Sequence, residues 1–410
     1  MASKKIKRTQ VKVVHQFSKN FKKKIFFFMT VINSLVWFLS YQGVGYDLVR
    51  SVAGDSKFSD FTLAIYYSPI FFDPRLINTQ PPFDYAMTPP LAALFRLIDL
   101  EDWMAYLVSL NLISLICFIY VLNKMIKLDK YIFIVILNSF PIVFCILRGS
   151  ADLWLLTLMT FTFYLYNVGK SFQSAILLGL LIACKPHFAA FGLIYLVKRD
   201  WRNICVLAAS TISFFLAPLF WLNSHGIFDQ LKVLARISAN YQRTYSIGDG
   251  GLMWDNGIIG LLKVVFYSLA QPNNLQALDF GLFATRIQPV IAIILVILVV
   301  KKYVKFTPSV EELWLASSIL FILMSPVSAS YRLVFFVPAL IFYLYKSTDR
   351  FILISLTFLL LPKSFIWVKT SNGHEFVGDS LINPMILIVL CLYLFIFKTN
   401  SNSIQKINKM

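Results

Sequence analysis

A single aspartate marks the stretch of sequence with the clearest chemical potential. Residues 54–69 read GDSKFSDFTLAIYYSP, and no charged residue follows Asp60 until Asp73. Aromatic residues, among them Tyr66 and Tyr67, surround this aspartate. A carboxylate in such a setting can cap a helix, lie in a solvated loop, or act as a general base that takes a proton from a reacting hydroxyl. The rest of the chain is needed to choose between these roles.

Three basic residues stand at turns between apolar segments. Arg148 flanks a short turn with Asp152, and the two can form a salt bridge between helix ends or mark a functional site. Lys185 lies within an apolar stretch, directly before Pro186. It can neutralise a phosphate, pair with a nearby carboxylate, or extend its ammonium group to the membrane interface. Arg332 follows a polar turn, and its planar guanidinium suits phosphate.

The three cations Arg148, Lys185 and Arg332 lie on turns expected to face outward, and together they predict an anionic ligand held at the membrane, such as a lipid phosphate, although each alone could be an ordinary interfacial residue. His187 can donate to a phosphate oxygen, although a lone histidine is more often a satisfied polar residue. Walker, HExxH, GxSxG, EF-hand and paired Cys/His motifs are missing from the sequence. This argues against a nucleotide-driven pump or a metalloprotease, and we expect neither a metal nor another cofactor.

These residues are set in a strongly apolar chain. Of its 410 residues, 58% are hydrophobic and only 14% are charged, and the mean hydropathy is +0.71. A soluble domain has about a quarter of its residues charged. Apolar runs long enough for transmembrane helices recur along the chain. The sequence therefore predicts an all-α, polytopic membrane protein with about 10–12 membrane helices.

The predicted membrane spans are separated by turns of contrasting charge. We expect spans at 25–45, 104–122, 131–147, 152–168, 203–222, 283–300, 312–325, 333–346, 351–366 and 382–397. The stretch 172–197 is too short for two full spans, so we expect a hairpin of two short helices that turns at Lys185. The segment 257–270 is expected to be interfacial or re-entrant.

The net charge of +18 gathers in turns and tails, as the positive-inside rule predicts for cytoplasmic segments. We therefore expect no nucleic-acid partner, and we place both termini in the cytoplasm of a multi-pass plasma-membrane protein. Residues 1–24 form a basic tail, 25–397 a single membrane domain, and 398–410 a C-terminal tail. The large outer loops are 46–103, with amphipathic interfacial helices, and 223–282. The five cysteines show no disulfide or zinc spacing.

The order of several short motifs resembles the GT-C glycosyltransferases, specifically family 87, the polyprenyl-phosphate-mannose-dependent α-mannosyltransferase-like family. Asp60-Phe61 and Tyr66-Tyr67 form a D-F-x4-Y-Y motif, and Tyr85 begins a Y-x3-P-P-L motif. They are followed by a G-x-x-(N/D) turn at 149–152, a small-residue helix that ends in Lys-Pro at 185–186, and an S-P-x-S loop at 325–328.

The resemblance implies transfer of a hexose, with mannose as the expected sugar, from a polyprenyl-phosphate donor to an acceptor glycan or glycolipid on the outer membrane face. The acceptor hydroxyl attacks the anomeric carbon with inversion, and the departing lipid phosphate is stabilised by cations. Asp60 fits the base, and Lys185, His187, Arg332 and Arg148 fit the donor phosphate. Positions expected to contact substrate are Tyr66, Tyr67, Tyr85, Asp152, Ser325, Ser328 and Tyr331.

Three other functions stay open from the residues alone. A transporter or flippase of lipid-linked sugars would show internal pseudo-symmetry and ionisable groups near the midplane. A polysaccharide polymerase or ligase would share the large outer loops, but would rely on arginines and histidines there. A non-catalytic membrane scaffold is the remaining alternative.

Overall fold

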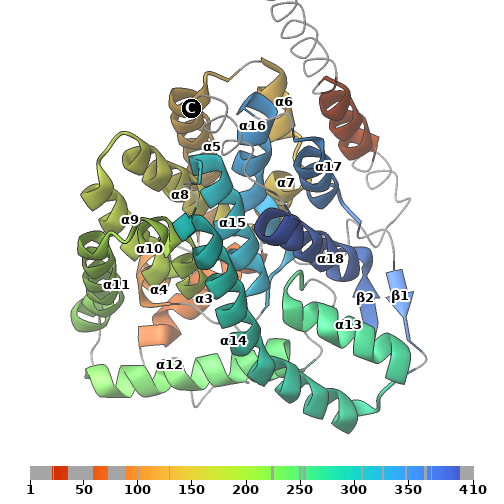
Figure 1. The fold of residues 1–410 in the computed structure, drawn as a ribbon. Helices are drawn as coiled ribbons and strands as arrows, with labels where there is room; N and C mark the ends of the chain where they lie inside the picture. Colours follow the sequence, from red (N-terminus) through yellow and green to blue (C-terminus); the bar gives the residue numbers. More distant parts are fainter. Residues whose placement is uncertain are drawn as a thin grey trace, which may run out of the picture.

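The computed structural model is built almost entirely of helices (Figure 1). It describes residues 21, 23–35, 59–72, 88–98, 101–128, 130–222, 226–248, 252, 255–305, 308–325, 327–346, 349–363, 367–370 and 372–397. Within this part, four helices are long and apolar enough to cross a membrane: Trp103–Ile126, Trp201–Trp221, Asn274–Val304 and Gly378–Phe397. The prediction of an all-α membrane protein is therefore confirmed.

The first expected outer loop contains two helices that pack on each other, α3 (Ser59–Phe72) and α4 (Pro89–Arg96). Two prolines open α4, where their fixed φ and missing N–H suit the first helical turn. Asp60 is the second residue of α3. It thus lies inside the first turn rather than at the N-cap that the sequence allowed. The parts of the predicted loop at 46–58 and 73–87, including Tyr85, lie outside the described residues.

The middle of the chain forms eight consecutive helical elements. They are α5 (Trp103–Ile126), α6 (Lys130–Leu137), α7 (Phe140–Arg148), α8 (Asp152–Asn167), α9 (Ser171–Cys184), the 3₁₀ helix η2 (Pro186–Gly192), α10 (Leu193–Lys198) and α11 (Trp201–Leu222). The span predicted at 131–147 is not continuous, because it breaks between α6 and α7. Pro141 near the start of α7 has no N–H to continue the hydrogen-bond ladder of a longer helix.

The stretch expected to turn at Lys185 does break there. α9 ends at Cys184, Lys185 has an extended backbone (φ −145°, ψ 109°), and η2 begins at Pro186. The hydroxyl of Thr88, which precedes α4, donates to the carbonyl oxygen of Cys184 at 2.6 Å. This bond ties the start of α4 to the turn that carries Lys185.

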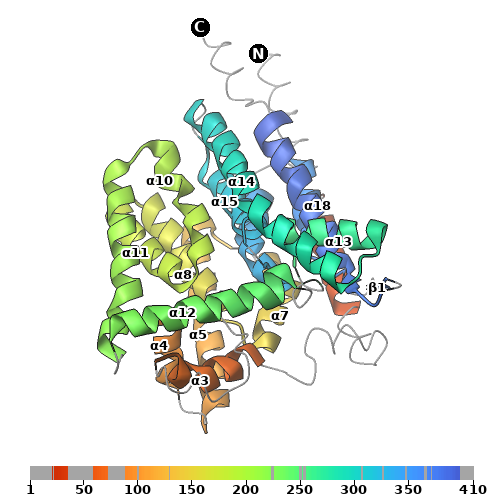
Figure 2. The same cartoon turned by 90° about the horizontal axis from the view of Figure 1, so that it is seen from below.

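The second large loop is also helical. It contains α12 (Ile227–Tyr241), the π-helical segment η3 (Gln242–Ile247) and α13 (Ile258–Ala270), and it leads into α14 (Asn274–Lys305). In Figure 2, α12 runs across the view, whereas α11 and α18 run from top to bottom. α13 spans only about 20 Å at 1.5 Å per residue, which is too short to cross a bilayer. It packs against α14 and α18.

The C-terminal part completes the bundle. Its elements are α15 (Val310–Leu323), the 3₁₀ helix η5 (Ser330–Phe335), α16 (Phe336–Lys346), α17 (Arg350–Leu359), the strands β1 (Trp367–Lys369) and β2 (Glu375–Val377), α18 (Gly378–Leu392) and the π-helical η6 (Tyr393–Phe397). The two strands form an antiparallel hairpin in which Trp367 lies opposite Val377. This hairpin was not predicted from the sequence. The span predicted at 351–366 also extends several residues beyond the end of α17 at Leu359.

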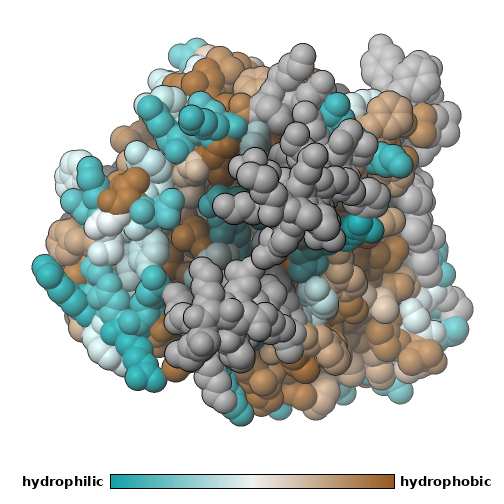
Figure 3. All heavy atoms as spheres, turned by 45° about the horizontal axis from the view of Figure 1, so that its top comes forward, coloured by the Kyte–Doolittle hydropathy of each residue, from teal (hydrophilic) through white to brown (hydrophobic). Residues whose placement is uncertain are grey.

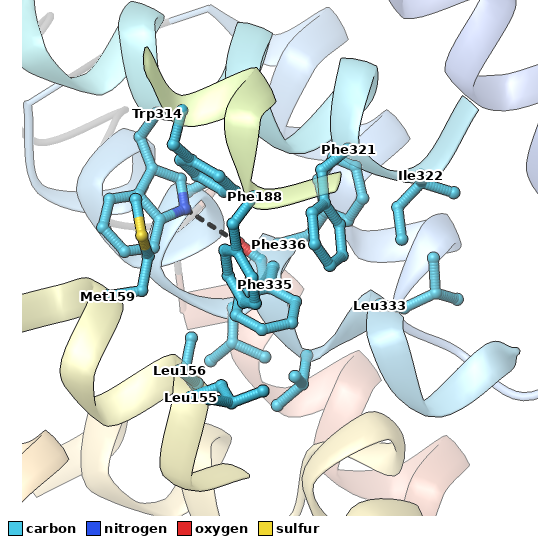
Figure 4. Close-up of a cluster of buried hydrophobic side chains, with 14 of the residues drawn as sticks. Leu155, Leu156, Met159, Phe188, Trp314, Phe321, Ile322, Leu333, Phe335 and Phe336 are labelled. Carbon is cyan, nitrogen blue, oxygen red and sulfur yellow. Dashed lines mark hydrogen bonds between the residues drawn. The ribbon is translucent and has the colours of Figure 1, made fainter. Parts of the chain in front are cut away.

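Buried aromatic side chains join η2 to α15 and η5. The ring of Phe188 lies 4.9 Å from that of Phe321 and 5.2 Å from that of Phe335, centroid to centroid. The indole of Trp314 donates to the carbonyl oxygen of Phe335 at 2.8 Å (Figure 4). This packing fixes the segment after Lys185 against the segment that carries Arg332.

The outside of the molecule is partly apolar. In Figure 3, hydrophobic side chains cover much of the lower right of the face shown, and hydrophilic side chains gather on its left. Large apolar side chains such as Trp221, Phe228 and Ile293 are exposed. An extended apolar surface of this kind fits helices that contact lipid.

Candidate active site

Asp60 and Arg148 form an ion pair at the junction of α3 and α7. Nη2 of Arg148 lies 2.6 Å from Oδ1 of Asp60. Arg148 is the last residue of α7, and Gly149 follows in the left-handed conformation (φ 66°) that ends the helix. A left-handed residue costs a glycine little, since it has no Cβ. The chain can therefore turn at once and begin α8 at Asp152.

Asp152 and Lys185 form a second ion pair, from α8 and from the break after α9. Nζ of Lys185 lies 2.8 Å from Oδ2 of Asp152. The carboxylate is fully buried, and the hydroxyl of Ser150 donates to the same oxygen at 3.0 Å. The lysine is thus held inward by a carboxylate, one of the alternatives that the sequence left open, and its side chain is only 16% exposed.

The two pairs lie close enough for their charges to act on one another. Burial raises the pKa of Asp60, the positive charges of Arg148 and Lys185 oppose this rise, and the negative charge of Asp152 adds to it. A carboxylate with a raised pKa is a better proton acceptor than an exposed aspartate. Asp60 therefore has the environment that a general base needs, next to two cations.

Arg332 and His187 lie on the α15 side of this centre. The guanidinium of Arg332 donates to the hydroxyl of Ser325 at 2.6 Å and to the carbonyl oxygen of Val327. The ring of His187 packs edge-on against Phe321, with 5.1 Å between the ring centres. Arg332 therefore contacts both Ser325 and Val327, and the aromatic core described above connects the segment that carries Arg332 to η2.

Three buried polar atoms near these pairs have no hydrogen-bond partner among the described residues. They are Oδ1 of Asp152, Nε2 of His187 and Oγ of Ser328. Buried polar groups are nearly always hydrogen-bonded in folded proteins. All three atoms belong to residues that the sequence predicted to contact the donor or the substrate.

Asp255 was not assigned a role from the sequence. Oδ1 of Asp255 accepts hydrogen bonds from the backbone N–H groups of Gly257 and Ser328, each at 2.8 Å. Burial raises the pKa of Asp255, and these two bonds, followed by the charges of Lys263 and Arg332, oppose the rise. The carboxylate joins the start of α13 to the Ser325–Ser328 loop, a contact between segments more than 70 residues apart.

Tyr241 was also missed, because it lies in a loop that was not expected to be helical. It ends α12, and its ring packs at a tilt against that of Tyr245, with 4.8 Å between the ring centres. Burial raises the pKa of its phenol, the charge of Arg332 opposes the rise, and Tyr245, Asp255 and Asp60 add to it. Tyr241 therefore lies within electrostatic reach of both buried carboxylates.

The structure does not bring all predicted substrate positions to this centre. Tyr66 is about half exposed, and its described ring contact is with Tyr67, at 5.0 Å between centres. The side chain of Tyr331 and all of Tyr85 lie outside the described residues. Within the described part of the chain, no cluster of three or more His, Cys, Asp or Glu side chains could hold a metal ion.

Comparison with known proteins identifies the family. The model of glycosyltransferase family 87 matches residues 78–328. The chain belongs to this family. The matched region contains Arg148, Asp152, Lys185 and Asp255, whereas Asp60 precedes it and Arg332 follows it. No curated protein and no solved structure matches the chain. The protein is therefore a membrane glycosyltransferase, and the resemblance stated from the motifs is confirmed.

Proposed function

We propose that this glycosyltransferase moves a hexosyl residue, most simply mannosyl, from a polyprenyl-phosphate donor to a hydroxyl of an acceptor glycan or glycolipid. The observation that carries the proposal is the buried carboxylate of Asp60, in ion-pair contact with Arg148 and within the field of Lys185. A base beside two cations suits a reaction in which a hydroxyl loses its proton while a phosphate leaves.

In the proposed reaction the acceptor oxygen attacks the anomeric carbon on the face opposite the phosphate. The new C–O bond forms as the bond between the anomeric carbon and the phosphate oxygen breaks, which inverts the configuration. The hydroxyl proton passes to Asp60, and the electron pair of the broken bond leaves with the polyprenyl phosphate. Every atom and charge is then accounted for without a further reactant.

The cations have two tasks in this scheme. Arg148 helps to keep Asp60 ionised despite its burial. Its five N–H donors also allow it to contact a phosphate oxygen while it holds the carboxylate. Lys185 and Arg332 add positive charge where the departing phosphate gains negative charge, and His187 offers a further donor. Asp152 positions Lys185 and compensates its charge before the donor binds.

We also propose that the reaction takes place at the outer face of the plasma membrane. The basic turns at Lys124–Lys130, Lys198–Arg202 and Lys301–Lys305 have the composition of cytoplasmic segments. In the predicted topology each of these segments lies at the opposite end of a span (104–122, 203–222 or 283–300) from one of the predicted outer loops, which carry Asp60 and Asp255. A polyprenyl chain anchored in the outer leaflet would bring its phosphate to the membrane surface there.

The test uses purified full-length protein in liposomes, with radiolabelled polyprenyl-phosphate mannose and a mixture of envelope glycolipids as acceptors. We expect a labelled product with a new glycosidic bond, and no product when GDP-mannose replaces the lipid donor. Movement of the intact labelled lipid across the bilayer without a new bond would contradict the proposal. So would equal use of the nucleotide sugar.

A further inference from the structure

A buried polar cluster in the C-terminal part of the chain is not used by the proposed reaction. It consists of Lys363, after α17, and of Asp379 and Asn383, one turn apart at the start of α18. Nζ of Lys363 lies 3.8 Å from Oδ1 of Asp379, and the backbone N–H of Lys363 donates to the same oxygen at 3.2 Å. All three residues are at least 94% buried, and they lie beyond the residues that the family model matches.

The cluster continues into the loop that precedes α13. Nδ2 of Asn383 donates to Oδ1 of Asp379 at 3.1 Å and to Oδ1 of Asn256 at 2.7 Å. Asn256 is itself fully buried, 127 positions earlier in the chain. Because one amide group contacts both partners, the orientation of Asn256 is coupled to the position of Asp379.

From Asn256 the hydrogen bonds lead to the loop that holds Arg332. The backbone N–H of Asn256 donates to the carbonyl oxygen of Ser328 at 2.7 Å, and its side-chain amide donates to the same oxygen at 2.9 Å. Asp255 accepts from the N–H of Ser328. Asp255 therefore binds the N–H of Ser328, and its neighbour Asn256 binds the carbonyl oxygen. Ser328 lies four positions before Arg332.

Such a cluster is costly if it only fills space. Burying a lysine and an aspartate carries a desolvation penalty, and well-packed apolar residues of the same volume are often as stable or more stable. A hydrogen-bonded connection to a loop of the reaction centre gives the cluster a role that apolar residues cannot fill. Groups that contact substrate need supporting residues that fix them to within a fraction of an ångström.

We infer that Lys363, Asp379 and Asn383 are positioning residues that set the Ser325–Arg332 loop through Asn256, so that helices outside the family-matched region determine how Arg332 meets the donor phosphate. This inference rests on the proposed function, because it takes Arg332 to contact the donor. The cluster acts on the donor side of the reaction, because its hydrogen bonds lead to the loop that carries Arg332.

The first variant is Asn383→Leu, which keeps the branched shape of the side chain and removes both hydrogen bonds. The matched control is Asn372→Leu, since Asn372 also joins distant segments by donating to Pro272 at 3.1 Å, but lies exposed beside the β-hairpin. We expect kcat/KM for the polyprenyl-phosphate mannose donor to fall about tenfold to a hundredfold in Asn383→Leu. The acceptor KM should stay at the wild-type value, and the control should match the wild type in both.

A second variant separates positioning from stability, and it also serves if Asn383→Leu does not fold. Lys363→Met with Asp379→Leu replaces the ion pair by apolar side chains, which removes two buried charges but leaves the backbone N–H of Lys363 without its acceptor, so the melting temperature should fall by only a few degrees. Its donor KM should nevertheless rise, because Asn383 loses its Asp379 partner. A folded double variant with wild-type donor KM and kcat would overturn the inference. Failure of the proposed function would look different, because the wild type itself would then form no product.

Discussion

The guanidinium of Arg148 holds the carboxylate of Asp60 at 2.6 Å, although 88 positions separate them in the chain. The contact joins the first turn of α3 to the last turn of α7. It places a strongly basic group against the carboxylate that we propose as the proton acceptor. The pair therefore combines two requirements of the reaction, an ionised base and a cation near the leaving phosphate.

Replacing Asp60 by asparagine tests the base directly. Asn keeps the size of the side chain and can still accept a hydrogen bond from Arg148, but it cannot take a proton. We expect kcat to fall by about 100-fold or more, the usual contribution of a general base, with little change in donor KM. Asp229→Asn is the control, because Asp229 is exposed on α12 and pairs locally with Lys232. Transfer at the wild-type rate by Asp60→Asn would remove Asp60 from this role.

The pH dependence of the rate should reflect the surroundings of Asp60. Only the ionised carboxylate can accept the proton, so kcat/KM is lost as the pH falls through the pKa of Asp60. Burial raises this pKa and Arg148 is the strongest opposing influence. We expect the acidic limb of the profile to move to higher pH in Arg148→Gln, because the lowering influence is removed.

The control for this shift is Arg236→Gln, which makes the same charge change on the exposed side of α12. Its acidic limb should coincide with that of the wild type. If the limb of Arg148→Gln stays in place while its rate falls, Arg148 does not act through the ionisation of Asp60. Rates should be measured from pH 4 to pH 9 at donor concentrations well below KM.

The ion pair of Lys185 with Asp152 should show strong coupling in stability. Lys185→Met leaves a fully buried carboxylate without its ammonium partner, and the loss of one member of a buried pair costs about 3–5 kcal/mol. Adding Asp152→Leu removes the stranded charge, so the double variant should recover much of the lost stability. The measurement is the thermal unfolding midpoint in detergent. If the loss of stability in the double variant equals the sum of the losses in Lys185→Met and Asp152→Leu, the two side chains do not interact.

The same double variant separates stability from function. We expect it to remain inactive at ordinary donor concentrations, because no ammonium group is left at position 185 to meet the phosphate. Lys185→Arg should keep part of the activity, since the charge is retained with a different geometry. A stable and fully active double variant would assign Lys185 a purely structural role.

The sequence predicted the class of fold and the main charged groups of the site for identifiable reasons. Long apolar runs such as Trp103–Ile126 and Asn274–Val304 have the composition of membrane helices whatever their neighbours are. Asp60, Arg148, Lys185 and Arg332 stand out because charge is expensive in apolar surroundings. The structure brings Asp60 and Arg148 into contact, and it places Lys185 and Arg332 within the same group of charges.

Other features depend on contacts that a linear pattern does not contain. The pairing of Arg148 with Asp60 and of Lys185 with Asp152 joins residues 88 and 33 positions apart. α12 was missed because only one of its faces is apolar, with Val233 and Ile237 buried, so a hydropathy window averages it to a polar loop. Asn383 lies in a helix whose length and hydropathy are those of an ordinary membrane span. Its contact with Asn256 becomes visible only in the folded structure.

The close approach of α9 to α11 provides a test of the packing that holds Lys185 at the end of α9. A Cβ added at Gly179 would overlap the hydroxyl of Ser210, and would lie 2.8 Å from the Cβ of Ser210 and 2.9 Å from the backbone nitrogen of Thr211. Since backbone cannot move aside without shifting α11, we expect Gly179→Ala to lower stability by about 1–3 kcal/mol. Gly192→Ala is the control, because its nearest neighbour is a side-chain methyl of Leu207 at 3.4 Å. Adding Ser210→Gly to Gly179→Ala should recover part of the loss, and unchanged unfolding midpoints in all three variants would show that the two helices lie farther apart.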